Sequence, residues 1–195
     1  YSMPWQIIPI EACPPVEINT DGYNVETYIK LTHSSSIEKK ILTLLSSCQF
    51  LLFLKSDNIK MSFIVDGNER VRIEKSKVNG QVVLSSNGVE DSRWLIYCND
   101  KVEVPANLRS LINADINTPD KLKDANTFDL SFAVALGKNN KLKRLEKEES
   151  LIFTYLPTSY RFGNEGFPFL VNANFITDAG RQQLHKDSEW NKLIF

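Results

Sequence analysis

The spacing of apolar residues changes along the chain from a helical period to a strand period. Residues 35–48 carry one apolar stripe at three- and four-residue spacing, which predicts an amphipathic helix: its members are Ile37, Ile41, Leu44, Leu45 and Cys48. Ser35, followed three residues later by Glu38, forms the capping-box pattern that starts helices. The apolar run QFLLFLK that follows indicates a return of the chain into the core.

Beyond residue 58 apolar and polar positions alternate, which is typical of strands with one buried face. Ile59, Met61, Phe63 and Val65 begin the pattern, after an earlier alternating stretch, VETYIKL, at residues 25–31. The turn sequences DGN (66–68), NG (79–80) and NG (87–88) separate four short segments. This spacing predicts an antiparallel meander.

The second half of the chain predicts further strands and the start of a C-terminal helix. Residues 105–126 fit either a short helix with a loop or a loop alone. Two strands are expected, at the alternating residues 128–136 and at LIFTYLP (151–157), with LKRL (141–144) returning after a turn. In the last ten residues Asp187 is a candidate N-cap, and Trp190, Leu193 and Ile194 form an apolar side. The predicted fold class is α+β (mixed α/β): an antiparallel, strand-rich sheet with a few packed helices.

The domain organisation follows from length and from the two ends. A chain of 195 residues can form one connected core, so residues 1–195 are expected to make a single domain. Residues 1–24 are an irregular lead-in, because Pro4, Pro9, Pro14 and Pro15 interrupt regular structure. The missing initiator methionine and the helical pattern at the C-terminus indicate a fragment of a longer multidomain chain.

Composition narrows the classes of function. The 23 basic and 24 acidic side chains give a net charge of -1, which argues against nucleic-acid partners and anionic membranes. No segment approaches the roughly 20 apolar residues of a membrane span. Cys13, Cys48 and Cys98 are far apart in sequence and odd in number, a pattern of neither a disulfide framework nor a CxxC site, so we expect an intracellular, cytoplasmic protein. No pair of histidines or cysteines has ligand spacing, so no metal site is expected.

Hydrolytic chemistry is weakly indicated. His33 precedes a serine run that is typical of helix capping. His185 lies near Asp187 and Ser188, which are the residue types of a catalytic triad, but the serine lacks a nucleophile-elbow sequence. GNEG at 163–166 lacks the Lys-Ser/Thr pair of a phosphate loop and is interpreted as a surface turn. A stand-alone hydrolase using His185 is one functional hypothesis, and two others follow below.

Arg181 is the most informative candidate, at the end of the stretch FPFLVNANFITDAGRQQLH (167–185). It is either a solvent-facing loop residue or an arginine whose planar fork is held to meet a phosphate or carboxylate. Asn172 and Asn174, at i and i+2 of a strand, place two amides on one face. With Gln182 they would support the loop that carries Arg181.

The same stretch carries a family resemblance. YLPTSYRFGNEGFPFLVNANFITDAGRQQL resembles the region that follows the ATP-binding domain in sacsin-like proteins, which are relatives of the heat-shock chaperones in the GHKL ATPase superfamily. Two more stretches resemble that family in the same order, one at residues 25–65 and one at 132–158, so the similarity runs from about residue 27 onward. In the stretch that contains Arg181, the positions that match the family are Pro168, Val171, Asn172, Phe175 and Arg181. Ala173 stands where the family has glycine, and residues 178–180 replace its serine-rich turn.

The resemblance implies a chaperone middle-type segment that couples the ATP state of an upstream domain to conformational change. An upstream Bergerat-type domain would hold ATP and Mg²⁺, no cofactor would bind within these 195 residues, and Arg181 would reach the γ-phosphate. The expected partners are that upstream ATP-binding domain of the same chain and client proteins. No activity is expected for the fragment alone. The alternative is a non-catalytic protein-protein interaction module in which Arg181 belongs to a structural loop.

Overall fold

The computed structural model describes residues 35–46, 48–160, 167–178, 180 and 183–195. The chain divides into two compact units, Tyr1–Lys40 and Ile41–Phe195, and the boundary falls within helix α1 (Ser35–Leu45). α1 confirms the helix predicted from the apolar stripe. The predicted lead-in (1–24) and the predicted strand at 25–31 lie outside the described residues.

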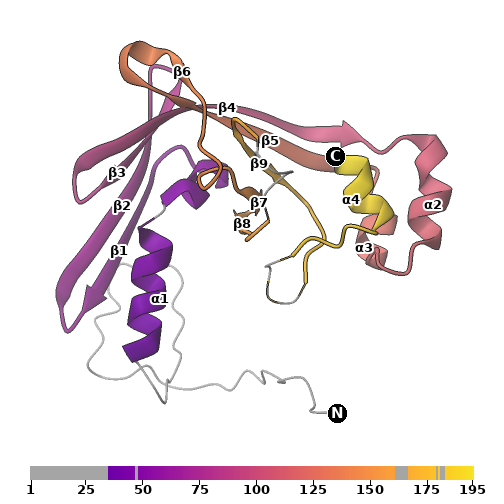
Figure 1. Ribbon diagram of the computed structural model, residues 1–195, viewed down its shortest axis with the longest axis horizontal. Helices are drawn as coiled ribbons and strands as arrows, with labels where there is room; N and C mark the ends of the chain where they lie inside the picture. Colours follow the sequence, from indigo (N-terminus) through magenta and orange to yellow (C-terminus); the bar gives the residue numbers. More distant parts are fainter. Residues whose placement is uncertain (1–34, 47, 161–166, 179, 181–182) are drawn as a thin grey trace. The chain divides into compact units, whose positions relative to one another are not determined.

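The second unit is built on a nine-stranded mixed sheet, shown in Figure 1. Its order is β1-β2-β3-β4-β5-β9-β7-β8, and β6 also pairs with β5. All strand pairs are antiparallel except β7 with β9. The strands are β1 (Ile59–Val65), β2 (Asn68–Val78), β3 (Gln81–Ser86), β4 (Val89–Glu103), β5 (Thr127–Leu136), β6 (Leu142–Lys143), β7 (Ile152–Thr154), β8 (Leu156–Pro157) and β9 (Leu170–Ala173). The mixed α+β class predicted from the sequence is confirmed.

Three tight turns produce the meander β1–β4. Each has two successive residues at positive φ: Asp66 and Gly67, then Asn79 and Gly80, then Asn87 and Gly88. Turns of this kind match the right-handed twist of the flanking strands and favour Asn-Gly and Asp-Gly. The turn sequences therefore predicted these three hairpins correctly.

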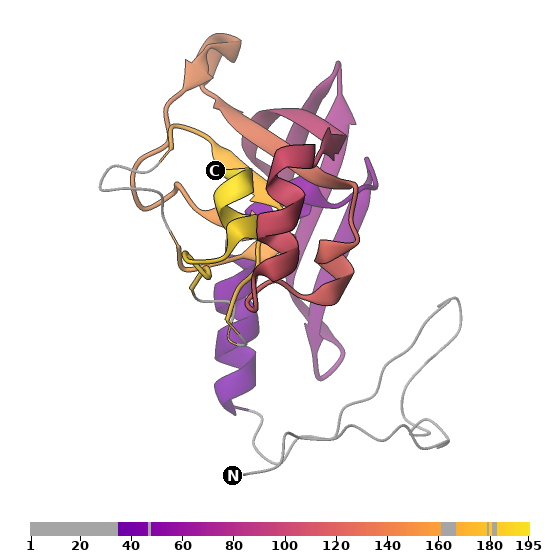
Figure 2. The ribbon, with the colours of Figure 1, turned by 90° about the vertical axis from the view of Figure 1, so that its right-hand side faces the viewer.

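Short helices complete the unit. The segment left open at 105–126 contains η2 (Ala106–Leu108), α2 (Arg109–Ala114) and α3 (Asp120–Lys123), and the C-terminal helix is α4 (Glu189–Ile194). Figures 1 and 2 show α2, α3 and α4 gathered at one end of β4 and β5. There Trp190 packs edge-on to Phe128, with ring centroids 5.9 Å apart, in a cluster with Val104 and Ile112.

The sheet buries a different cluster on each face. The 3-10 helix η1 (Cys48–Phe53) covers the inner face, where Leu51, Leu52 and Phe53 pack with residues such as Ile73 and Leu84. The expectation that QFLLFLK returns to the core is thus confirmed. The outer face of β7 and β9 is covered by a second cluster, whose buried members are Ile152, Val171, Ala173, Phe175 and Leu184.

Two local predictions were wrong. Residues 151–157 are not one strand, because the chain reverses at Tyr155 (φ 63°) and divides into β7 and β8. The N-cap position of α4 is Ser188 rather than Asp187, and its side chain makes no capping bond. The Asp115 carboxylate instead accepts the Glu189 backbone N–H at 2.9 Å. An acceptor 74 positions away in sequence cannot be identified from local capping patterns.

Candidate functional site

Two of the predicted site residues come together around Tyr155. Asn172 is 2% exposed on β9, and its Oδ1 accepts the Tyr155 backbone N–H at 2.7 Å. The Tyr155 hydroxyl lies within hydrogen-bond distance of two acceptors, Asp129 Oδ2 at 3.1 Å and Asn174 Oδ1 at 3.2 Å, which share its single proton. The two amides therefore hold the backbone and the side chain of the residue at which β7 turns into β8.

Arg181 and Gln182 lie outside the described residues, but the two ends of their loop are described. Thr177 and Leu184 form an isolated antiparallel bridge. Next to it the Asp178 N–H donates to the Gln183 carbonyl at 3.0 Å, and the Gln183 N–H donates to Asp178 Oδ1 at 3.3 Å. We call residues 176–178 and 183–185 the stem. The stem closes the segment that contains Arg181 at its base.

Helix α4 anchors this stem to the unit. Trp190 is fully buried, and its indole N–H donates to the Asn174 carbonyl at 2.8 Å. Asn191 is equally buried, and its Nδ2 donates to the His185 carbonyl at 3.0 Å. The His185 N–H in turn donates to the Ile176 carbonyl at 3.1 Å. The stem is therefore fixed by partly buried hydrogen bonds and by packing.

The hydrolase hypothesis at His185 finds no catalytic arrangement. Ser188 is fully buried, and its hydroxyl lies 3.3 Å from the Thr118 hydroxyl. Among the described residues no histidine lies within hydrogen-bond reach of this hydroxyl, and a buried serine in that setting is not an activated nucleophile. In the described part of the chain the Ser188–Thr118 contact and the His185 carbonyl, which accepts from Asn191, hold α4 in place. His33 and GNEG (163–166) lie outside the described residues.

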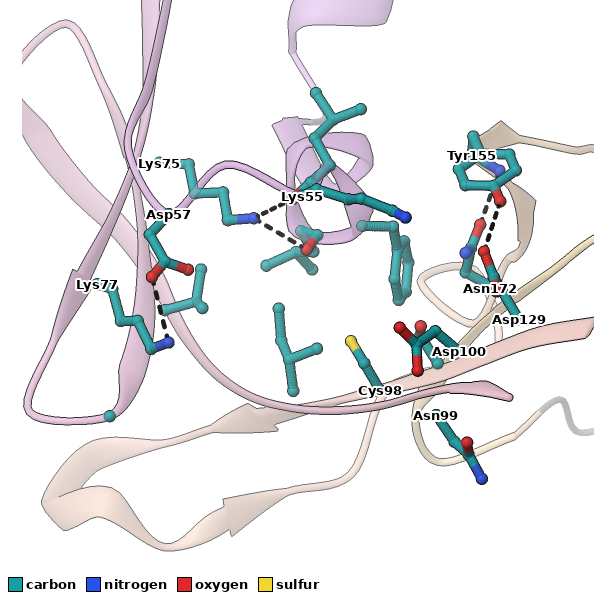
Figure 3. A pocket seen from close by; sticks show the side chains of 17 residues that line it. Lys55, Asp57, Lys75, Lys77, Cys98, Asn99, Asp100, Asp129, Tyr155 and Asn172 are labelled. Atoms are coloured by element: carbon teal, nitrogen blue, oxygen red, sulfur yellow. Dashed lines mark hydrogen bonds and ion pairs between the residues drawn. The ribbon is translucent and has the colours of Figure 1, made fainter. Parts of the chain in front are cut away.

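Sequence reasoning missed a pocket of about 480 Å³ on the inner face of the sheet, shown in Figure 3. Strand register aligns Cys98, Ser131 and Asn172 in one row across β4, β5 and β9. The walls are partly apolar, and the charged side chains are Lys55, Asp57, Lys75, Lys77, Asp100 and Asp129. These groups come from the meander, from β5 and from the segment after η1, so they meet only in the folded unit.

Lys75 is the unusual member of this set. Its side chain is 5% exposed, and its Nζ donates to the Leu54 carbonyl at 2.6 Å and to the Leu52 carbonyl at 3.2 Å. Burial lowers the pKa of its ammonium, while Asp57 and Cys98 act in the opposite direction. In sequence, Lys75 continues the alternation of Val71 and Ile73. That register was the available signal that a lysine would face inward.

The other ionisable groups differ in their setting. Lys77 pairs with Asp57 at 3.3 Å, and both are about half exposed. Burial, together with the Asp129 carboxylate, raises the pKa of the Tyr155 hydroxyl. Cys98 is an exposed thiol, whereas burial and nearby Asp91 raise the pKa of Cys48 to about 11.

The remaining observations are negative. Over the described ranges, no three His, Cys, Asp or Glu side chains cluster as a metal site would require, and no helix is both long and apolar enough to cross a membrane. Comparison of the chain with protein-family models, curated proteins and solved structures found no match.

Proposed function

We propose that this chain is the middle-type segment of a sacsin-like chaperone ATPase, in which Arg181 reaches the γ-phosphate of a nucleotide bound elsewhere. An upstream domain of the same chain holds ATP and Mg²⁺, and this segment couples nucleotide state to conformational change. The supporting observation is the stem, in which Thr177 pairs with Leu184 and a buried asparagine bonds to its backbone. A loop closed at its base by such a stem is suited to present one side chain outside the unit.

The chemistry gives a reason for such an arrangement. In phosphoryl transfer, negative charge spreads over the γ-phosphoryl oxygens, and an arginine from outside the nucleotide pocket stabilises it. Such a contact is most effective when the donor is preorganised, because little reorganisation then accompanies the reaction. A fixed stem supplies that preorganisation, and domain closure would make the contact depend on the nucleotide.

The test is an Arg181→Ala substitution in the full-length protein. ATP affinity should change by less than about threefold, because the nucleotide is held by the upstream domain, while turnover should fall by about a hundredfold or more. Arg70→Ala is the matched control, since Arg70 is an exposed arginine on β2, and it should leave both quantities unchanged. Unchanged turnover in Arg181→Ala would refute the assignment.

A second candidate function, a non-catalytic interaction module, is favoured by an exposed apolar patch on the outer face of the sheet. Tyr97 and Leu95 on β4 are 63% and 41% exposed, and they pair across the sheet with Phe132 and Val134 of β5. Contiguous exposed apolar side chains typically mark binding surfaces. The partner would be a partly unfolded client that exposes apolar side chains of its own.

This candidate can be tested by suppression of aggregation. The chain should reduce light scattering by heat-denatured citrate synthase, and the double substitution Leu95→Ser with Tyr97→Ser should remove that effect. Ile116→Ser is the control, because Ile116 is 93% exposed but lies in the segment between α2 and α3. Equal suppression by the double variant would exclude the patch as the client site.

A further inference from the structure

The pocket on the inner face contains a buried cation with an unused hydrogen-bond donor. An ammonium carries three N–H donors. Lys75 uses two of them on the carbonyls of Leu52 and Leu54, and no carboxylate within the described part of the chain pairs with it. Buried charges are normally paired or fully hydrogen-bonded, because removing them from water is expensive. An acceptor that enters the pocket would complete the coordination of this ammonium.

The other end of the same pocket carries acceptors. Asp129 on β5 receives one hydrogen bond, from the Tyr155 hydroxyl to Oδ2, and Asp100 on β4 has no partner among the described residues. Figure 3 shows Lys75 on one side of the pocket and Asp129 on the other, with Cys98 between them. Lys77 and Asp57 neutralise each other by their ion pair. Lys55 also lines the pocket, and Figure 3 draws its side chain toward Asp100 and Asp129, whose two carboxylates still leave one negative charge in excess. The pocket therefore has a cationic end at Lys75 and a net anionic end at Asp129.

We propose that this pocket binds a short peptide-like zwitterion, with its carboxylate at Lys75 and its ammonium at Asp129. The volume of about 480 Å³ lies within the range of small-ligand sites. Apolar walls at Phe53, Val82 and Ile96 exclude water from the middle of the ligand and strengthen both charged contacts. The site is separate from the nucleotide contact proposed above, and its test requires no ATP.

Three probes of equal length separate the two ends: triglycine, its N-acetylated form and its C-terminal amide. Each derivative lacks one of the two terminal charges. Isothermal titration of the chain should give the tightest binding for triglycine. Each derivative should bind about tenfold or more weakly, the size expected for one charge-assisted hydrogen bond. Diglycine and tetraglycine measure the spacing between the two ends.

Substitutions assign the ends to residues. In Lys75→Met the preference for triglycine over its amide should fall from about tenfold to about one, because the carboxylate has lost its partner. Lys77 lines the same pocket, so Lys77→Met is the control, and it should keep the preference for triglycine over its amide. In Asp129→Asn the preference for triglycine over the N-acetylated form should disappear, while Asp57→Asn should retain it. Such ratios report on ligand contacts, so a purely structural role of either residue would leave them unchanged.

Three outcomes would overturn the proposal. One is the absence of saturable binding of triglycine at concentrations up to about 10 mM. Another is equal binding of all three probes. The last is a carboxylate preference that survives in Lys75→Met. If Lys75→Met does not fold, the Asp129→Asn comparison decides, because Asp129 is only half-buried and its replacement keeps the shape of the side chain.

Discussion

The side chain of Asn191 pairs with the backbone of Ile176 in both directions. The Ile176 N–H donates to Asn191 Oδ1 at 2.8 Å, and Asn191 Nδ2 donates to the Ile176 carbonyl, also at 2.8 Å. This amide takes the place that a neighbouring strand would have in a sheet. Ile176 lies two residues before Asp178, where the loop that contains Arg181 begins. One buried side chain of α4 thus fixes the entry into that loop.

Asn191→Ala should destabilise the unit by about 3 kcal/mol. The change removes three hydrogen bonds, each worth about 1 kcal/mol, and leaves the Ile176 N–H without a partner, while the Ile176 carbonyl keeps the His185 N–H. Urea unfolding followed by circular dichroism measures the loss. Lys192→Ala, at the exposed neighbouring position of α4, should change stability by less than about 0.5 kcal/mol. Equal effects of the two substitutions would show that Asn191 is not the anchor.

Asp115 should make stability depend on acidic pH. Burial opposes ionisation of its carboxyl, but hydrogen bonds from Thr118, Asn117 and Glu189 outweigh it and lower the pKa from 3.8 to about 2. A lowered pKa means that the folded state favours the carboxylate. Its contribution is therefore complete above pH 3.8 and lost as the pH falls towards 2. In Asp115→Asn the decline of unfolding free energy over this range should be shallower than in the wild type. An identical decline would contradict this role.

Lys75 should make stability depend on pH in alkali, with the same sign as Asp115 has in acid. Burial lowers the pKa of its ammonium, with Asp57 and Cys98 partly compensating. Between the folded and unfolded pKa the unfolded chain binds more protons, so the stability of the wild type should rise with pH there. The unfolding free energy of the wild type and of Lys75→Met is measured at each pH, and the difference between the two is compared. Other groups titrate in both proteins, so their contribution cancels in this difference. That difference should shift in favour of the wild type as the pH increases. A flat difference would argue against a buried ammonium.

The two described cysteines should differ in reactivity. Cys98 is exposed, whereas Cys48 is buried, and its pKa of about 11 keeps it protonated near neutrality. Since the thiolate is the nucleophile, iodoacetamide at about pH 8 should modify Cys98 at least tenfold faster than Cys48. Peptide mapping by mass spectrometry measures both rates. In denaturant the rates should converge, and a fast Cys48 in the folded protein would be incompatible with this burial.

Local sequence predicted the parts of the fold that local chemistry determines. The hairpins followed from Asn-Gly and Asp-Gly pairs whose backbone adopts positive φ, and α1 followed from its apolar stripe. For β5 the sequence showed which residues face the outer side of the sheet, but not which ones face the core. Its outer-face apolar residues alternate visibly, whereas its inner face carries Ser131, Ala133 and Ala135, which are too small to stand out as core positions.

The pocket could not be predicted because it depends on contacts between distant segments. Lys75 lies in the charged stretch ERVRIEKSKV, which reads as an exposed hairpin arm until η1 packs against it. Tyr155 reverses the chain in a positive-φ conformation that Asn172 stabilises from 17 positions away. In contrast, Asn172 and Asn174 were identified from their i, i+2 spacing alone. The structure adds that both bind Tyr155.

Amide hydrogen exchange in the full-length protein tests the central claim, that the loop between Asp178 and Gln183 responds to the γ-phosphate. The peptide covering residues 176–185 should exchange more slowly with a non-hydrolysable ATP analogue than with ADP, and Arg181→Ala should remove the difference. A peptide from the β2–β3 hairpin, residues 70–86, should exchange equally in both states. Equal exchange of residues 176–185 with the two nucleotides would contradict the account.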